Sequence, residues 1–239
     1  MLIPLIENKI PFIDVRAPSE FMLGAVPTSK NLPILSNNER TEVGKIYKES
    51  GNKAAIEKGY SLVNGITKDK RISNWIKFLN RNPQAKMYCA RGGQRSKIAQ
   101  NWMKESGIDI DIVKGGFKAL RNTCIEVLDN ASRDDKEWII IAGKTGSGKT
   151  KIIKQLTNSI DLEGLANHRG SAFGGFETLQ PTPVNFENNL AYDYLSISSN
   201  KVFIEDESKT IGRLVIPENF FNKMNSSKLV VIQEPIENR

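Results

Sequence analysis

A cysteine in a loop rich in glycine and arginine is the residue of this sequence best suited to chemistry. Cys89 follows a short apolar stretch, and the run Arg91-Gly92-Gly93-Gln94-Arg95-Ser96 begins two residues later. Apolar spacing predicts a helix over residues 96–106, which would place Cys89 at a helix N-terminus among backbone N–H donors and guanidinium groups. Such surroundings favour a thiolate, and the same donors can hold an oxyanion or a sulfur or selenium anion. We therefore predict that Cys89 is catalytic, within an anion-binding loop formed by Arg91, Gly92, Gly93, Arg95 and Ser96.

The second cysteine, Cys124, has a different setting. It falls in a predicted helix over residues 118–128, among apolar neighbours and outside any glycine-rich loop. A buried structural thiol is the common state of such a cysteine, and it is also the alternative for Cys89. Packing alone does not require two glycines between two arginines, so we expect reactivity at Cys89.

A second site is predicted at residues 143–150, which match the phosphate-binding pattern G-x-x-x-x-G-K-[ST]. The context fits, because an apolar strand over residues 138–142 precedes the loop and a helical pattern follows it. Backbone N–H groups of such a loop converge on phosphate oxygens, the lysine adds a charge, and the hydroxyl can reach Mg²⁺. The predicted phosphate-binding residues are Gly143, Gly146, Gly148, Lys149 and Thr150.

Two further segments could serve this second site. An apolar run over residues 201–208 ends in carboxylates, and either Glu205 or Asp206 could position Mg²⁺ together with Thr150. Ordinary acidic residues at a strand end are the alternative. The glycine-rich segment 168–175 is predicted to be a substrate loop that begins with His168 and Arg169.

Composition narrows the classes of function. The chain has 39% hydrophobic and 26% charged residues, and it contains one histidine and two cysteines. These counts leave almost nothing for a zinc site or a Ser-His-Asp triad and suggest no disulfide framework. No apolar stretch reaches the roughly 18 residues of a membrane span, and no signal peptide is evident. We therefore predict a cytoplasmic protein with no membrane partner.

Positive charge is concentrated in the first half of the chain. Residues 1–130 carry 21 basic and 13 acidic residues, a net charge of +8, whereas residues 131–239 carry 13 and 14, a net charge of −1. A basic domain can attract a polyanion such as RNA. The predicted RNA contacts are Arg40, Lys45, Lys48 and Lys53, for which a solvated helix face is the alternative.

Strand and helix signals alternate, which predicts an α/β protein with parallel sheets. Buried strands are expected at residues 10–15, 87–88 and 108–113, with a helix over residues 73–80. The predicted organisation is a first domain at 1–130 with a helical insertion near 36–59, a linker at 131–137, and a P-loop NTPase-like α/β domain at 138–239. An apolar strand at 229–232 is expected in the sheet of this second domain.

The first half resembles the rhodanese-like family, in which the loop cysteine carries a persulfide or a related chalcogen adduct. This resemblance rests on residues 13–21, 24–34, 115–120 and the Cys89 loop. Combined with the P-loop, it extends to the tRNA 2-selenouridine synthase family, a fusion of both domain types. The additional matching segments are residues 39–48, 167–174, 186–188, 205–208 and 211–213. Members of that family continue with a further helical region, so we expect a shortened member or a fragment, with an incomplete second domain.

The resemblance implies a transferase that converts wobble 2-thiouridine of tRNA to 2-selenouridine through an S-geranylated intermediate. It implies selenophosphate and geranyl diphosphate as co-substrates and the anticodon arm of tRNA as partner. We expect no tightly bound cofactor, and the only ion in this prediction is the Mg²⁺ that Thr150 could hold with Glu205 or Asp206. A selenophosphate-supplying enzyme is a further expected partner.

Two other functions remain open. Cys89 and Arg95 enclose five residues, the C-x-x-x-x-x-R length of cysteine phosphatases. The first alternative is therefore a sulfurtransferase or cysteine phosphatase fused to a P-loop ATPase or kinase-like domain. The second is a nucleotide-gated RNA-binding module without catalysis.

Overall fold

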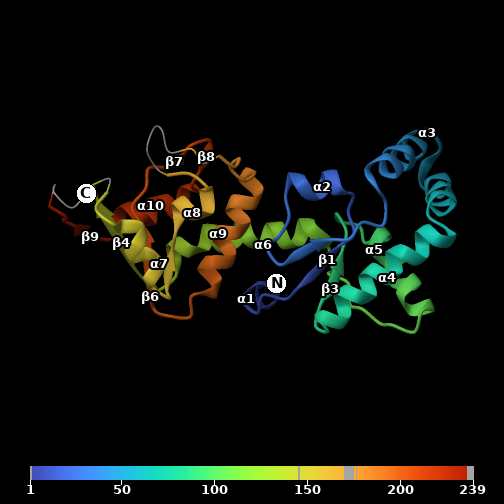
Figure 1. Ribbon diagram of the computed structural model, residues 1–239, viewed down its shortest axis with the longest axis horizontal. Coiled ribbons are helices and arrows are strands. Elements are labelled where there is room, and N and C mark those ends of the chain that lie inside the picture. Colours follow the sequence, from blue (N-terminus) through green and yellow to red (C-terminus); the bar gives the residue numbers. More distant parts are fainter. Residues whose placement is uncertain (1, 145, 170–174, 176, 236–239) are drawn as a thin grey trace. The chain divides into compact units, whose positions relative to one another are not determined.

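The chain forms two compact units (Figure 1). The computed structural model describes residues 2–144, 146–169, 175 and 177–235. One unit comprises residues 9–121, and the other comprises residues 3–8 together with residues 122–239. Helix α6 (Gly116–Asn130) contributes residues to both units. The predicted linker at 131–137 holds the short helix η1 (Ala131–Arg133) and the first residue of strand β4 (Glu137–Gly143), and the domain boundaries stay predictions.

The first unit is built on a three-stranded parallel sheet. Its strands are β1 (Phe12–Asp14), β2 (Ser29–Asn31) and β3 (Lys86–Tyr88), in the order β2-β1-β3. The central strand β1 is buried at every position, as expected for a parallel sheet covered by helices. This arrangement confirms the predicted α/β class for the first half of the chain.

The helices of the first unit close its core around two tryptophans. Trp75 and Trp102 stack with ring centroids 6.2 Å apart, and both are buried beside Ile13 and Met103. The helices are α2 (Pro18–Leu23), α3 (Asn37–Leu62), α4 (Gly65–Arg81) and α5 (Gln94–Glu105), followed by the start of α6.

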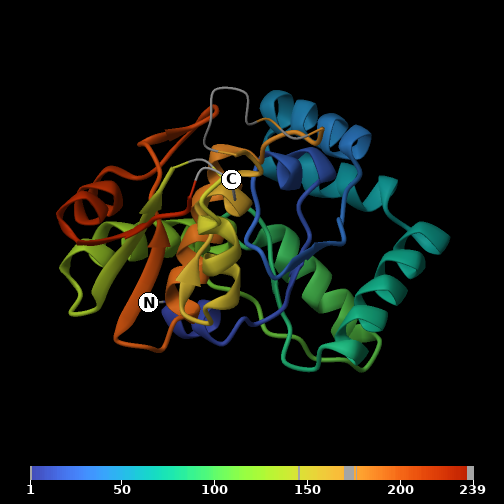
Figure 2. The same ribbon diagram turned by 60° about the vertical axis from the view of Figure 1, so that its left-hand side comes forward.

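Helix α3 contains the segment predicted as a helical insertion, and it bends back in the middle (Figure 2). Gly51 breaks the helix with a φ of 79° and a ψ of −172°, a backbone conformation that favours glycine. At its start, the N–H of Glu39 donates to Ser36 Oγ, and the N–H of Ser36 donates to Glu39 Oε2 at 2.6 Å. This reciprocal cap sets the first turn of the helix.

The prediction of a strand over residues 108–113 is wrong. Only Ile112 forms a bridge, to Met87 of β3. Two backbone hydrogen bonds hold it, from the N–H of Met87 to the carbonyl of Asp111 and from the N–H of Val113 to the carbonyl of Met87. The turn before α6 follows at once, with Gly115 at a φ of 81°, so pairing does not extend.

The second unit contains a four-stranded parallel sheet in the order β5-β6-β4-β9. Strand β4 pairs with β6 from Glu137 opposite Lys201 to Ile141 opposite Glu205. This register brings the end of β6 and the loop after β4 to the same edge of the sheet. The remaining elements are α1 (Ile3–Glu7), α7 (Lys149–Gln155), β5 (Ser159–Ile160), α8 (Leu162–Ala166), α9 (Pro183–Ser196), β6 (Lys201–Glu205), β7 (Thr210–Ile211), β8 (Leu214–Val215), α10 (Glu218–Ser226) and β9 (Lys228–Ile232).

Apolar side chains are unevenly covered in this unit. Trp138 of β4 packs on Phe220 of α10 with ring centroids 4.5 Å apart, and both are buried. The predicted strand at 229–232 is the edge strand β9, whose Leu229, Val230 and Val231 are exposed.

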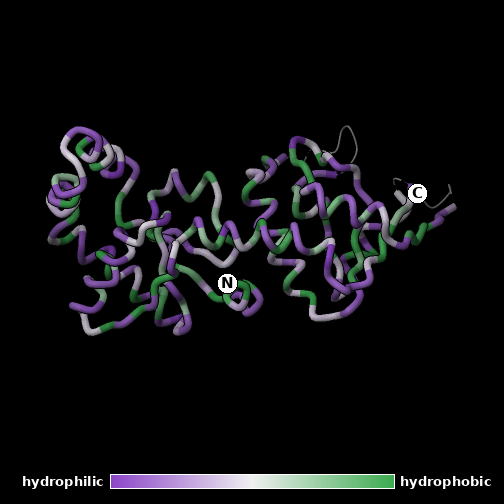
Figure 3. Tube along the Cα trace, turned by 180° about the vertical axis from the view of Figure 1, so that it is seen from behind, coloured by the Kyte–Doolittle hydropathy of each residue, from purple (hydrophilic) through white to green (hydrophobic). Residues whose placement is uncertain are grey.

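In Figure 3, α3 of the first unit is mostly hydrophilic, with shorter apolar stretches. Among the described residues, no helix is long and apolar enough to cross a membrane.

Candidate functional site

The predicted thiol lies where strand β3 ends and helix α5 begins. Cys89 is buried, and Ser96 Oγ of α5 lies 3.4 Å from its Sγ and 3.0 Å from the carbonyl oxygen of Gly93. Gly93 occupies the N-cap of α5 with a φ of 81°, which turns the loop into the helix. Three of the predicted loop residues, Gly93, Ser96 and Cys89, are therefore brought together.

The N-terminus of α6 holds the backbone of this loop. The N–H of Phe117 donates to the carbonyl oxygen of Cys89 at 2.8 Å, and the N–H of Lys118 donates to that of Ala90 at 3.0 Å. A Cβ on Gly116, whose φ is 60°, would lie 2.3 Å from the oxygen of Cys89. Glycine is thus required here both for the backbone conformation and for the close approach.

A buried ion pair supports the same loop from strand β1. Arg16 donates to both carboxylate oxygens of Asp14, with the shortest contact 2.6 Å, and both side chains are almost fully buried. The guanidinium lies 3.9 Å from the ring centroid of Phe117 in α6. Burial, followed by the charge of Asp14, raises the pKa of Tyr88 on β3 well above its ordinary value. Neither Asp14 nor Arg16 was among the predicted site residues.

The two arginines of the loop have different surroundings. Arg91 is exposed, whereas Arg95 makes two hydrogen bonds to Glu20 of α2, at 2.5 and 2.9 Å. Burial alone would raise the pKa of Glu20, but the bonds and charge of Arg95 outweigh it and hold the pKa below its ordinary value. Arg40 adds a longer contact to Glu20 at 3.7 Å. The charge of Arg95 is therefore largely neutralised by a carboxylate that the sequence did not reveal.

The phosphate-binding loop adopts the expected strand–loop–helix setting. Gly146 and Gly148 both have a φ of 84°, and Gly148 is the N-cap of α7. Lys149 Nζ donates to the carbonyl oxygen of Gly143 at 2.8 Å, so the ammonium lies folded over the loop. Within the motif, Thr145 lies outside the described residues.

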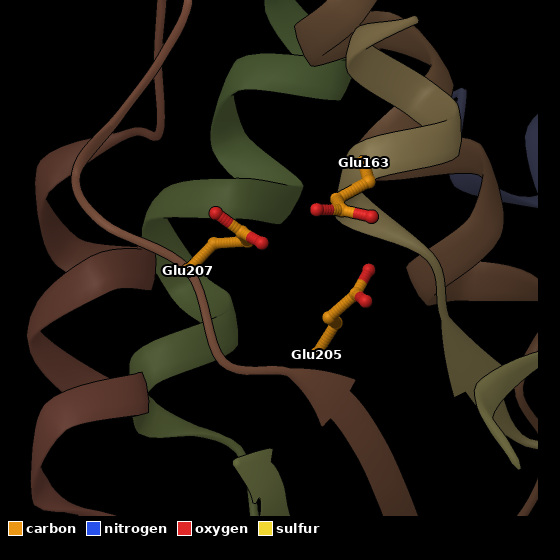
Figure 4. Close-up of side chains that lie close together, drawn as sticks. All are labelled: Glu163, Glu205 and Glu207. Carbon is orange, nitrogen blue, oxygen red and sulfur yellow. The ribbon is translucent and has the colours of Figure 1, made fainter. Parts of the chain in front are cut away.

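Three carboxylates converge beside this loop (Figure 4). Glu163 comes from α8, Glu205 ends β6, and Glu207 follows two residues later. One ligand atom of each lies within 4.8 Å of the others. Thr150 Oγ1 of the loop donates to Glu205 Oε1 at 2.9 Å and lies 3.3 Å from Glu163 Oε2.

The carboxylate cluster is electrostatically strained at neutral pH. Burial, then the charge of Glu163, raises the pKa of Glu205 to about 7. Burial, then the charges of Glu163 and Glu205, raises the pKa of Glu207 to about 7, although Lys149 opposes this rise. Oε2 of Glu205 is buried without a hydrogen-bond partner among the described residues. Hard oxygen ligands that crowd one another in this way fit a divalent cation such as Mg²⁺.

The structure distinguishes between the two predicted carboxylates. Glu205 is fully buried in the cluster, whereas Asp206 is exposed and is anchored through its backbone N–H to Ile141. Strand β6 ends at Glu205, and the chain beyond it brings Glu207 back to the cluster while Asp206 stays exposed. The acidic run at the end of the strand was visible in the sequence, but Glu163, some 40 residues earlier, gave no such signal.

The predicted substrate loop is only partly described. His168 forms an isolated bridge with Gly175, and its N–H donates to the carbonyl oxygen of Glu163 at 3.1 Å. Arg169 is exposed, and residues 170–174 lie outside the described residues. The backbone of His168 therefore lies next to α8, the helix that carries Glu163.

The predicted RNA contacts all lie on α3. Lys45, Lys48 and Lys53 are exposed, whereas Arg40 is half-buried next to Glu20. The bend at Gly51 places Lys53 on the second arm of the helix and the other three on the first.

Comparison with known proteins matches each half of the chain to a family model. Residues 3–123 match the model of the rhodanese-like domain, and residues 136–239 match that of the tRNA 2-selenouridine synthase AAA domain. The chain belongs to the rhodanese-like family. Over nearly its whole length it is also a homologue of tRNA 2-selenouridine synthases.

Three relatives named tRNA 2-selenouridine synthase illustrate the similarity. That of Shewanella woodyi is 48% identical over 232 residues, which cover 96% of this chain and 63% of the relative. That of Nitrosomonas eutropha is 44% identical, with 96% and 61% covered, and that of Sulfurovum sp. is 47% identical, with 98% and 65% covered. The chain therefore spans less than two thirds of the length of these relatives.

Proposed function

We propose that this rhodanese-like homologue takes part in converting wobble 2-thiouridine of tRNA to 2-selenouridine in the cytoplasm. The observation that carries the proposal is the presence, in one chain, of the Cys89 loop and of a P-loop with a carboxylate cluster. Two relatives whose alignments cover 96% of this chain are named tRNA 2-selenouridine synthase.

The two sites suit two successive steps. In the first, the sulfur of the base attacks the geranyl carbon of geranyl diphosphate, and diphosphate leaves. In the second, the selenium of selenophosphate attacks C2 of the base and the geranyl thiol leaves, after which water cleaves the Se–P bond and releases phosphate. The diphosphate resembles the β- and γ-phosphates that a P-loop binds, so we assign the first step to the second unit and the second step to Cys89.

Each residue near the P-loop then has a role toward the diphosphate. Lys149 and the backbone N–H groups of the loop bind its oxygens, while Thr150, Glu205 and Glu163 would hold Mg²⁺. When bound, the ion supplies positive charge to the leaving diphosphate. The charge of Lys149 also acts on Glu207, where it opposes the rise in the pKa of that carboxyl.

The surroundings of Cys89 favour selenium exchange over phosphatase activity. A cysteine phosphatase needs the arginine of its C-x-x-x-x-x-R loop to bind the phosphate. Here the guanidinium of Arg95 is already held by two hydrogen bonds to Glu20. In our proposal the exposed Arg91 attracts the anionic selenium donor, which a selenophosphate-supplying enzyme would deliver.

The test is a pair of variants assayed on an anticodon stem-loop that contains 2-thiouridine. Lys149→Ala should abolish geranylation, whereas Cys89→Ser should still geranylate and should accumulate the S-geranylated RNA. Given a synthetic S-geranylated stem-loop and selenophosphate, Lys149→Ala should form 2-selenouridine and Cys89→Ser should not. Mass spectrometry of the nucleosides reports both steps, and equal loss of both steps in both variants contradicts this division.

A further inference from the structure

We propose that a pocket between α3 and α5 holds the aliphatic chain of the S-geranylated base while that base is at the Cys89 loop. This inference rests on the proposed function and adds to it a location for the chain. The pocket has a volume of about 850 Å³ and lies entirely within the first unit. Both arms of α3 line it, because the helix bends back at Gly51 (Figure 1).

The floor of the pocket is apolar. Ile34, Leu35, Ala55, Val63 and Trp102 line it and are buried. Such a surface offers dispersion contacts and few hydrogen-bond partners, which suits a branched hydrocarbon chain better than the polar edges of a nucleobase. The volume falls in the range of about 300–1,000 Å³ that is usual for pockets of drug-sized ligands, so a chain of ten carbons fits.

The rim of the pocket is cationic and aromatic. Arg40, Lys45 and Lys48 line it, together with the exposed rings of Tyr47 and Tyr60. Cations at the mouth complement phosphates, and exposed aromatic rings can stack on unpaired bases of an RNA loop. An apolar floor beneath such a rim fits a hydrocarbon chain attached to single-stranded RNA.

The pocket is continuous with the loop of Cys89. Gln94 and Arg95 line it, and the next residue, Ser96, lies 3.4 Å from Cys89 Sγ. A smaller cavity of about 370 Å³ shares Tyr60 and Gln94 with the pocket and extends to Gly92. A chain in the pocket would therefore tether its base near the loop where the sulfur is exchanged.

The experiment compares the affinity of two anticodon stem-loops, one with S-geranyl-2-thiouridine and one with 2-thiouridine. The wild-type chain should bind the geranylated RNA at least tenfold more tightly. Ala55→Phe, which fills the floor, should remove this preference and leave the affinity for the 2-thiouridine RNA unchanged. Ala54→Phe, at the neighbouring position outside the pocket lining, is the matched control and should keep the preference.

A second variant guards against misfolding of Ala55→Phe. Ile56→Asn makes the half-buried wall of both cavities polar and should also remove the preference, with the melting temperature reporting the fold. Folded variants that keep the wild-type preference overturn the proposal. An equal loss of affinity for both RNAs also overturns it, because the pocket would then hold the base rather than the chain.

Failure of the pocket and failure of the proposed function give different results. If the wild-type chain converts geranylated RNA to 2-selenouridine, and folded Ala55→Phe does so with an unchanged KM, the function stands and the pocket assignment is wrong. If the wild-type chain prefers geranylated RNA but never forms 2-selenouridine, the pocket assignment stands and the function is wrong.

Discussion

At the scale of single residues, the two thiols differ in what surrounds them, although both are buried. Cys89 lies on a short loop between β3 and α5, beside exposed Arg91 and Gly92, whereas Cys124 lies inside the 15-residue helix α6. Reagents reach a buried group through local opening, and a loop end opens more readily than the middle of a packed helix.

We therefore expect alkylation at pH 6 to label Cys89 well before Cys124. Iodoacetamide labelling followed by peptide mapping measures both rates in one sample, and Cys89→Ser should remove the fast phase. Faster labelling of Cys124 would contradict the assignment of Cys89 as the reactive thiol.

The carboxylate cluster predicts an effect of Mg²⁺ on stability. Mg²⁺ should raise the melting temperature of the wild-type chain, because it offsets the repulsion among Glu163, Glu205 and Glu207. Glu205→Gln should abolish most of that rise. It should itself be more stable than the wild type without metal at pH 8, because the pKa of about 7 means that the buried carboxylate is ionised at a cost there.

The neighbouring acidic residue supplies the control for this measurement. Asp206→Asn changes an exposed carboxylate outside the cluster and should keep the response to Mg²⁺. If Asp206→Asn loses the response and Glu205→Gln keeps it, the cluster does not hold the ion.

At the scale of elements, the N-terminus of α6 determines the shape of the Cys89 loop. Gly116→Ala should destabilise the first unit by more than the about 1–3 kcal/mol that an unfavourable backbone conformation alone costs, because its Cβ would lie 2.3 Å from the oxygen of Cys89. It should also reduce selenation. Gly107→Ala is the matched control, since its φ is 78° and a Cβ there meets nothing within 4 Å.

Denaturant titration of both glycine variants gives the comparison. Gly107→Ala should lose only the free energy of unfolding that the unfavourable backbone conformation costs, and it should keep its selenation activity. Equal losses of stability in the two variants would contradict the prediction. The Cys89 loop would then move away from α6 with no loss in the free energy of unfolding.

The start of α3 gives a prediction for pH dependence. Glu39 accepts two hydrogen bonds from Arg71, at 2.7 and 2.9 Å, and also caps the helix through Ser36. Burial raises the pKa of Glu39, but the bonds from Arg71 and Ser36 outweigh it and lower the pKa below 4.5. The stabilisation is therefore complete above pH 4.5 and is lost as the pH falls through the lowered value.

Glu39→Gln should consequently lose about 1.5–3 kcal/mol of the free energy of unfolding at pH 7, the usual range for hydrogen bonds to a charged group. Its difference from the wild type should shrink steadily below pH 4.5. Glu49→Gln, at an exposed position of the same helix, should change stability little at pH 7. A deficit of Glu39→Gln that stays constant down to pH 3 would contradict the role of the ion pair.

At the scale of the whole molecule, the net positive charge lies in residues 1–130, whereas residues 131–239 are nearly neutral. This difference predicts that RNA binds to the first half of the chain. Each phosphate neutralised by the protein releases counterions, which gives a log–log slope of roughly 0.7–0.9 per contact. Removing Lys45 and Lys48 together should weaken tRNA binding and flatten the salt dependence by about two contacts.

Binding measured at several salt concentrations tests this charge effect. A double alanine variant at Lys70 and Lys77, both exposed on α4, removes equal charge from another helix and should change the slope less. Unchanged affinity and slope in the Lys45 and Lys48 variant would place the RNA elsewhere.

The sequence by itself determined the elements whose geometry depends on contiguous residues. The Cys89 loop and the P-loop were predicted from motifs of contiguous residues, and glycines of both loops, Gly93 and Gly148, have the positive φ that turns each loop into its helix. The strand before each loop was also predicted, since runs of apolar residues are buried in parallel sheets. The segment at 108–113 misled for the same reason, because its apolar residues are buried or half-buried without pairing as a strand.

Only the tertiary structure decided which distant residues meet. The register of β4 against β6 brings Thr150 to Glu205, and the packing of α8 adds Glu163, which no local pattern connects to either. The bond between Glu20 and Arg95 and the pocket under α3 depend likewise on chain segments far apart in sequence. Side-chain spacing along a strand or helix sets which face of that element a residue occupies. Which other element packs against that face is decided only by the fold.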